Sequence, residues 1–176
     1  FFVHYDLSKE GGNGKGDQKT GNAKQPCGVV GELHDSSVKR VSAYKCATGV
    51  KIGNPAFRFS TGASAGKITD VFASGTAGTH LGIIVNPKEY VIEDGSLEAT
   101  LSLMKGSVAQ VASLGHINVQ VCEAVKAGNN AYYKAGSGWC ASKQTGSTAQ
   151  SDAVLGKFIT DGGTGETVAV AVDTLA

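Results

Sequence analysis

The chain has 176 residues, a length that suits one domain or one domain with an arm. Its 16 Lys and Arg nearly balance 15 Asp and Glu, which argues against nucleic acid as the main partner, because phosphate binding needs a clustered positive surface. The same balance gives no attraction to an anionic membrane, and no apolar run approaches the ~20 residues of a membrane helix. With 25 Gly and short runs of Ala and Val, the composition favours an all-β chain with many turns.

The first 26 residues divide into an aromatic tip and a polar spacer. Residues 8–25 are rich in Gly, Lys, Asn and Gln and show no apolar periodicity, so they cannot bury enough surface to fold alone. We therefore expect an N-terminal arm at 1–26 and a β-domain at 27–176. We predict that neighbouring molecules order the arm, and that its tip makes the contact through Phe1, Phe2, Val3, His4 and Tyr5.

Strand patterns begin after Pro26. Residues 37–49 alternate with neither face purely apolar, which suits an edge strand or a contact surface. Short extended runs follow at 56–60, 67–73 and 80–85. Residues 94–106 fit either a helix with Ser96 as its cap or an extended run, and the residues alone leave both open.

The stretch 105–133 carries the strongest pattern. It predicts a strand, a tight turn before Gly115, a second strand, a Gly-Asn turn at 127–130, and a further strand from Tyr132. The second strand has a period of two, which places three branched apolar side chains on one face: Ile117, Val119 and Val121.

A hairpin is expected at the end of the chain, where runs at 153–160 and 167–172 flank a DGGTG turn. In the second run Val alternates with Ala, so the strand can be covered closely on both faces. That fits a central strand of a small β-sandwich or β-barrel.

No motif carries chemistry in its required context. The run GASAG places Ser64 in a nucleophile position, but that mechanism needs a strand-to-helix turn and a strand is expected to follow. His34 beside Asp35 could act as an oriented base, yet both lie in an expected loop. Residues 11–16 lack the Ser or Thr of a phosphate loop, and residues 161–166 lack the alternating acidic ligands of a calcium loop. We predict no catalytic residue, no cofactor and no metal.

Four cysteines are widely spaced, and they allow two disulfides, a metal site or four small buried thiols. The spacing matches neither a zinc knuckle nor a small secreted framework, so we predict reduced thiols at Cys27, Cys46, Cys122 and Cys140.

Three runs together resemble the C-terminal half of tailed-phage capsid decoration proteins, also called structural cement proteins. They are GSVAQVASLGHINVQV at 106–121, AVKAGNNAYYKAGSG at 124–138 and DAVLGKFITDGGTGETVAVAV at 152–172. The run LGIIV at 81–85 fits the preceding strand of that family. The resemblance covers residues 80–174 and, more weakly, 26–79, and it favours extended structure at 94–106.

The resemblance implies a structural protein and not an enzyme. It implies a homo-oligomer, a dimer or a trimer, made in the host cytoplasm and bound to the outer surface of the capsid. Its partner would be the major capsid protein, whose lattice it stabilises, with no role for nucleic acid or a membrane.

An aromatic group allows two structural interpretations. Tyr132, Tyr133 and Trp139 could form a contact patch, or they could cap one end of the core. An alternative function, a carbohydrate- or receptor-binding β-module on a virion or cell surface, would need these three residues as an exposed aromatic shelf.

Overall fold

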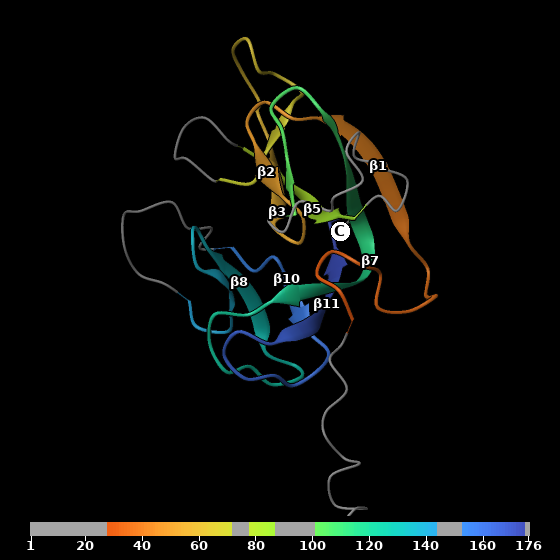
Figure 1. Ribbon diagram of the computed structural model, residues 1–176, viewed down its shortest axis with the longest axis vertical. Coiled ribbons are helices and arrows are strands. Elements are labelled where there is room, and N and C mark those ends of the chain that lie inside the picture. The colour runs from red at the N-terminus through yellow and green to blue at the C-terminus, as the bar shows by residue number, and fades with distance from the viewer. Residues whose placement is uncertain (1–27, 72–77, 87–100, 144–152, 175–176) are drawn as a thin grey trace, which may run out of the picture.

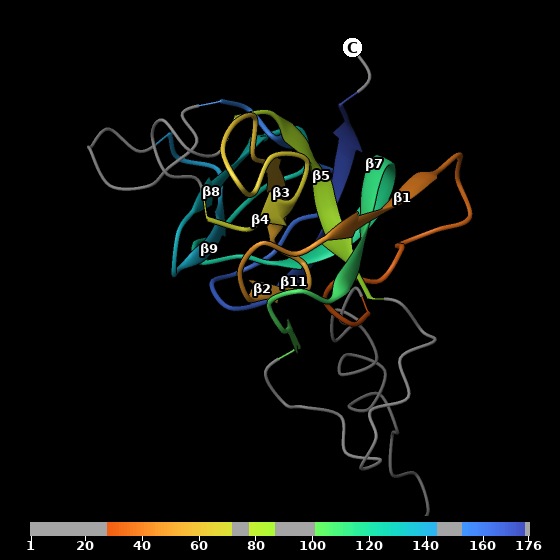
Figure 2. The same ribbon diagram turned by 90° about the horizontal axis from the view of Figure 1, so that it is seen from above.

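The computed structural model describes residues 28–71, 78–86, 101–143 and 153–174 (Figure 1). These residues form eleven strands and no helix, which confirms the all-β prediction. One curled antiparallel sheet contains nine strands, and a separate two-stranded sheet lies beside it (Figures 1 and 2). The predicted arm and residues 94–100 fall outside the described residues, as does Cys27.

The order along the main sheet is β4-β3-β5-β7-β11-β10-β8-β9, with β1 also paired to β7, while β2 and β6 form the small sheet. The strands are β1 (Arg40–Lys45), β2 (Val50–Lys51), β3 (Pro55–Arg58), β4 (Ile68–Thr69), β5 (His80–Val85), β6 (Ser102–Leu103), β7 (Val108–Gln120), β8 (Asn130–Lys134), β9 (Gly138–Cys140), β10 (Gly156–Phe158) and β11 (Thr167–Asp173).

The long strand β7 is the centre of this arrangement. Its first half lies between β1 and β5, so that Ala112 is opposite both Val41 and Ile83. Its second half lies between β11 and a short segment near the N-terminus, so that Ile117 is opposite both Val170 and Leu33. One 13-residue strand therefore joins the two parts of the main sheet.

The predicted tight turn before Gly115 is wrong. Strand β7 continues through Gly115, which has φ +136° and lies opposite Val172. The irregularity lies just before Gly115, because Arg40 is opposite Leu114 and Val41 is opposite Ala112, so that Ser113 is an extra residue in β7. A β-bulge bends and twists a strand without ending it. The bend lets a single strand serve two parts of a curled sheet.

This bend divides the interior into two clusters. The small core lies along the first half of β7 and contains Cys46, Val50, Ile52, Ala56, Ile68, Ile84, Ala109 and Val111. The large core lies mainly along the second half and contains sixteen buried residues, among them Trp139, Phe158, Ile117, Val119, Val168 and Val170.

The predicted C-terminal hairpin is confirmed. Strands β10 and β11 are antiparallel, with Phe158 opposite Val170. Val168, Ala169 and Val170 are each 0% exposed, so β11 is covered on both faces as the alternation of Val and Ala predicts. Strand β1 pairs with β7 alone among the described strands, in line with its predicted edge position. Of the run expected at 67–73, the described part, 67–71, forms a strand at Ile68–Thr69.

Candidate functional site

The first described residues are fixed along the free edge of the second half of β7. We call residues 28–35 the anchor segment. The Gly31 N–H donates to the Asn118 carbonyl at 2.7 Å, and the Asn118 N–H donates to the Glu32 carbonyl at 2.9 Å. The His34 N–H donates to the His116 carbonyl at 2.8 Å. The chain that follows the predicted arm is thus tied to the central strand of the sheet.

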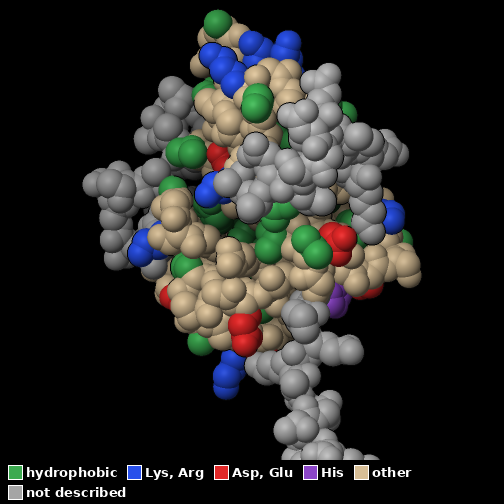
Figure 3. Space-filling view, viewed as in Figure 1, with side chains coloured by type: hydrophobic (Ala, Val, Ile, Leu, Met, Phe, Trp, Pro, Cys, Tyr) green, Lys and Arg blue, Asp and Glu red, His purple; other side chains and the backbone are tan. Residues whose placement is uncertain are grey.

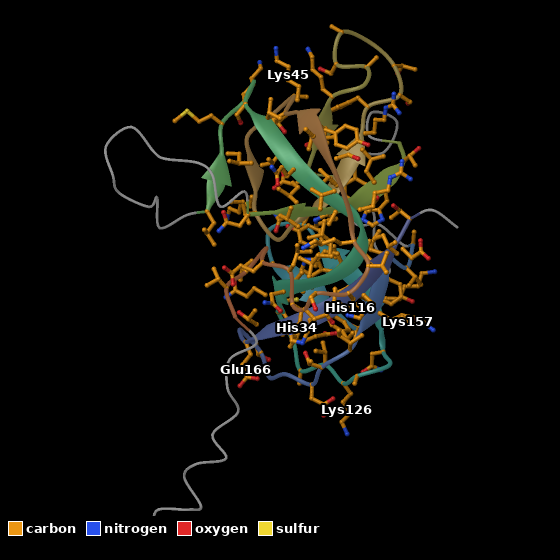
Figure 4. The ribbon with its side chains drawn as sticks, turned by 90° about the vertical axis from the view of Figure 1, so that its right-hand side faces the viewer. His34, Lys45, His116, Lys126, Lys157 and Glu166 are labelled. Carbon is orange, nitrogen blue, oxygen red and sulfur yellow. The ribbon has the colours of Figure 1, made fainter. Side chains whose placement is uncertain are left out.

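Two histidines reinforce this attachment through their side chains. His34 Nδ1 lies 3.0 Å from Oδ1 of Asn118, and His116 Nδ1 lies 2.6 Å from Oδ2 of Asp35. Both histidines belong to the half of the molecule that also contains Lys157 (Figure 4). The possible pairing of His34 with Asp35 is not formed, because the side chains of these two residues bind Asn118 and His116 instead. Hydrogen bonds from Ser37 and from His116 hold the pKa of Asp35 well below its usual range.

Gly31 explains how the anchor segment fits so closely. Its φ is +79°, and a Cβ at this position would lie 2.1 Å from Cγ2 of Ile52 in the small core. Only glycine tolerates that backbone angle cheaply and leaves the necessary space. Gly31 and Asn118 are two site residues that the sequence analysis did not identify. Asn118 is 2% exposed, although the alternation along β7 places it on the face opposite Ile117 and Val119, where polar residues are expected.

The three aromatic residues do not share one surface. Trp139 is 1% exposed and Tyr133 is 7% exposed. Their rings pack edge to face with centroids 5.6 Å apart, and the Trp139 indole N–H donates to the Gly53 carbonyl at 2.7 Å. Tyr132 is half-buried. This geometry favours the interpretation in which the aromatics cap the core, while the tip residues 1–5 lie outside the described residues.

Ser64 lacks the surroundings of a nucleophile. It sits in a turn where its carbonyl accepts a hydrogen bond from the Lys67 N–H at 2.9 Å, and strand β4 follows in place of a helix. The acidic residues of the 161–166 turn are also engaged. Asp161 accepts from the Ala127 N–H at 2.8 Å, and Glu166 accepts from the Gly163 N–H at 2.7 Å.

The described part of the chain contains no cluster of three His, Cys, Asp or Glu side chains that could hold a metal ion. Cys46, Cys122 and Cys140 are free thiols. Burial raises the pKa of Cys140 to about 12, so its reactive thiolate form is scarce at neutral pH. Within these same residues no helix is long and apolar enough to cross a membrane.

A hollow of about 370 Å³ lies between the two cores, with Asp70 and Trp139 among its lining residues. Asp70 Oδ2 accepts hydrogen bonds from the Lys51 N–H at 2.8 Å and from the Asn54 amide at 2.9 Å. The carboxylate therefore joins β2 to the loop before β3. A structural role accounts for its burial.

Comparison with known proteins found one family model and similar solved structures. A family model described as "Structural cement protein (E217 gp24/Pam3 gp6)" matches residues 17–173. A chain of "The capsid of Myoviridae Phage XM1" is similar in fold, with a TM-score of 0.61 and 18% identity, over 88% of this chain and 95% of that one. A chain of "The crystal structure of head fiber gp8.5 N base in bacteriophage phi29" matches over 77% of this chain and 95% of its own, with 17% identity and a TM-score of 0.41.

No match was found among curated proteins. The family model, in contrast, spans nearly the whole chain and includes every described residue except Thr174. The chain therefore belongs to the structural cement protein family, and it is a structural protein associated with a phage virion.

Proposed function

We propose that this protein binds the outer face of a tailed-phage capsid and stabilises the lattice of the major capsid protein. The family match over residues 17–173 carries this proposal. The mechanism requires no chemistry, because many copies that each bind weakly become strong together on a repeating lattice. The protein acts as a homo-oligomer, a dimer or a trimer, without a cofactor, nucleic acid or membrane, and it is made in the host cytoplasm.

The chain is divided into a binding arm at 1–26 and a β-domain at 27–176. The tip residues 1–5 insert into a groove of a neighbouring molecule or add a strand to its sheet. The anchor segment supports this division, because any load on the arm passes through three backbone hydrogen bonds to β7, the longest strand of the domain. A firm attachment is what an arm that clamps a neighbour requires.

The alternative of a carbohydrate-binding module is not favoured. It needs an exposed aromatic shelf, and two of its three members, Tyr133 and Trp139, are buried in the large core. An aromatic ring that binds a sugar must present one face to solvent. Trp139, at 1% exposed, cannot do so without opening the core.

The proposal is tested with purified protein and phage heads stripped of their decoration. Co-sedimentation should show saturable binding, and the bound protein should raise the temperature at which the heads release DNA. Absence of saturable binding to the heads of the phage that carries this protein would rule the proposal out.

The arm is tested in the full-length chain. Phe1→Ser with Phe2→Ser should weaken binding to heads by about tenfold or more, since buried aromatics dominate interface energies. Lys9→Ser with Lys15→Ser, in the spacer, is the matched control and should bind nearly as wild type. If the free protein already protects residues 1–6 from protease, the arm folds onto its own domain and the proposal for the tip fails.

A further inference from the structure

Charge is unevenly divided between the two halves of the domain. The small-core half (described residues 39–71, 78–86 and 101–113) contains one Asp and seven Lys and Arg: Lys39, Arg40, Lys45, Lys51, Arg58, Lys67 and Lys105. The large-core half (residues 28–38, 114–143 and 153–174) contains four Lys against six Asp and Glu. Among the described residues, the small-core half therefore carries an excess of positive charge, while residues 87–100, which lie outside the described part, contain one Lys and four Asp and Glu.

The single described carboxylate of the small-core half does not offset this charge at the surface. Asp70 is 7% exposed and is used internally by the Lys51 N–H and the Asn54 amide. Six of the seven cations are exposed and Lys67 is half-buried, and no exposed acidic residue lies among the described residues of the same half. The space-filling view shows Lys and Arg side chains gathered at one end (Figure 3).

The strand register brings three of these lysines to one end of the molecule. Cys46 pairs in parallel with Ile68, so the residues before them, Lys45 and Lys67, are neighbours. The Cys46 N–H donates to the Ser107 carbonyl at 2.8 Å, and the Gly106 N–H donates to the Cys46 carbonyl at 2.9 Å. These bonds draw the turn that carries Lys105 to the same place. Lys45 marks this cationic end, and Lys126 lies at the opposite end (Figure 4).

An exposed apolar surface adjoins the cationic end. On the outer face of β1, Val41 is 38% exposed, and Val108 opposite Lys45 is 46% exposed. Met104, in the turn next to Lys105, is 80% exposed. The other face of the same two strands packs into the small core through Ala109 and Val111. Met104 and Val108 thus form an exposed apolar surface beside these lysines, whereas Val41 lies further along β1, opposite the buried Ala112.

We infer that this surface faces the capsid and binds a protein surface whose apolar centre is surrounded by Asp and Glu. The inference rests on the proposed function and names the half of the domain that does the binding. Met is enriched in protein interfaces, and a cationic rim orients and speeds the encounter with an acidic partner. Nucleic acid is a poorer fit, because single strands bind on aromatic side chains and phosphates gain nothing from an apolar face.

The test compares two triple variants of the full-length protein that change the net charge equally. The first carries Lys45→Glu, Lys67→Glu and Lys105→Glu at the cationic end. The second, the matched control, carries Lys126→Glu, Lys143→Glu and Lys157→Glu in the large-core half. Binding to stripped heads is measured by co-sedimentation at several salt concentrations. The first variant should bind at least about tenfold more weakly with a flatter salt dependence, and the control should change less than about threefold.

A second pair of substitutions examines the apolar surface without changing charge. Met104→Ser with Val108→Thr should weaken binding to heads while circular dichroism shows an unchanged folded state. Loss of binding in this variant and in the first triple variant, but not in the control, supports the inference. Equal losses in both triple variants would show general repulsion by the shell and would overturn it.

The remaining outcomes separate this inference from the proposed function. If the wild-type protein fails to bind stripped heads, the proposed function fails and this inference fails with it. If the wild type binds and the first triple variant binds as tightly, only the inference fails. If the wild type binds a short DNA duplex in an anisotropy assay and the first variant alone loses that binding while retaining the heads, the surface serves nucleic acid and the inference is overturned.

Discussion

The two halves of the sheet share strand β7 but differ in their interiors and surfaces. The large core contains four aromatic residues, Phe57, Tyr133, Trp139 and Phe158, whereas the small core contains eight residues and no aromatic one. Aromatic side chains bury the largest apolar areas and dominate core energetics. The large core therefore supplies most of the stability, and the small core supports an exposed surface that can specialise in binding.

Replacement of Trp139 gives the sharpest test of this division. Trp139→Ala removes the largest buried side chain and leaves the Gly53 carbonyl without its indole donor. We expect the free energy of unfolding to fall by about 3–5 kcal/mol, measured by urea denaturation. Trp139→Phe, which keeps an aromatic ring, should cost less. Ile84→Val in the small core should cost about 0.5–1.5 kcal/mol. A larger loss for Ile84→Val than for Trp139→Ala would reverse the assignment of the two cores.

Gly82 tests how closely β5 must approach the central strand β7. Its φ is +141°, and a Cβ would lie 1.9 Å from the Ala112 carbonyl oxygen of β7. Gly82→Ala should therefore cost about 2–5 kcal/mol, from backbone strain together with a clash. The control is Gly62→Ala, at φ +78° with no atom within 4 Å of the added Cβ, which should cost only about 1–2 kcal/mol. Equal losses of unfolding free energy in Gly82→Ala and Gly62→Ala would show that the close contact between β5 and β7 adds no cost of its own.

His80 links stability to pH at the boundary between the halves. Its Nε2 is buried without a hydrogen-bond partner among the described residues, and its ring lies 5.6 Å from that of Phe57. Burial lowers the pKa of His80 from 6.5 to about 4, and a backbone hydrogen bond to Gly82 opposes this only in part. The unfolded chain thus takes up more protons between these two values. Stability should be complete above pH 6.5 and fall by up to about 3 kcal/mol as the pH drops toward 4.

The control for this pH dependence is His80→Gln, which cannot titrate and should remove most of the change in that window. Asp35 works in the same direction at lower pH, because its pKa lies below the usual value and its contribution disappears only as the carboxylate is protonated. The contributions of His80 and Asp35 to stability can therefore be distinguished, because they are lost in different pH ranges. A wild-type stability that stays constant between pH 6.5 and 4 would show that His80 is hydrated in solution.

Much of the fold could be predicted from periodicity. The alternation of Val and Ala in 167–172 gave the correct central strand, and the apolar face of 80–85 gave the correct β5. The failure at Gly115 has a physical reason. A glycine with positive φ is equally compatible with a turn and with a bulged strand, and the choice depends on whether partners such as Val172 and Lys39 are present on both edges. Those partners come from distant parts of the chain.

The site was less predictable than the fold, because it depends on contacts between residues that are far apart in the sequence. Asp35 is adjacent to His34 in sequence but pairs with His116, which is 81 residues away. The cationic end arises in the same way, since Lys45, Lys67 and Lys105 are separated by about 20 to 40 residues and meet only through strand register. A total charge of +1 concealed this segregation. Trp139 likewise packs into the large core and donates its indole N–H to the carbonyl of the distant Gly53, and no local pattern reveals these contacts.

The smallest expected effect concerns the stability of the charge variants themselves. Lys45 and Lys105 are exposed, and Lys67 donates to the Ala63 carbonyl in its own loop at 3.1 Å. Because surface charges away from buried partners contribute little, each of these three Lys→Glu changes should alter the free energy of unfolding by less than about 0.5 kcal/mol. Reversing them should even relieve some repulsion within the cationic half. Urea denaturation at low and high salt measures both effects, and the matched triple variant at Lys126, Lys143 and Lys157 provides the comparison.

If the cationic-end variant loses more than about 1 kcal/mol of unfolding free energy, its lysines stabilise the small-core half, and weaker binding to heads would then reflect a damaged fold. If stability is unchanged while binding falls, the two halves have separate tasks: one holds the structure and the other makes the contact.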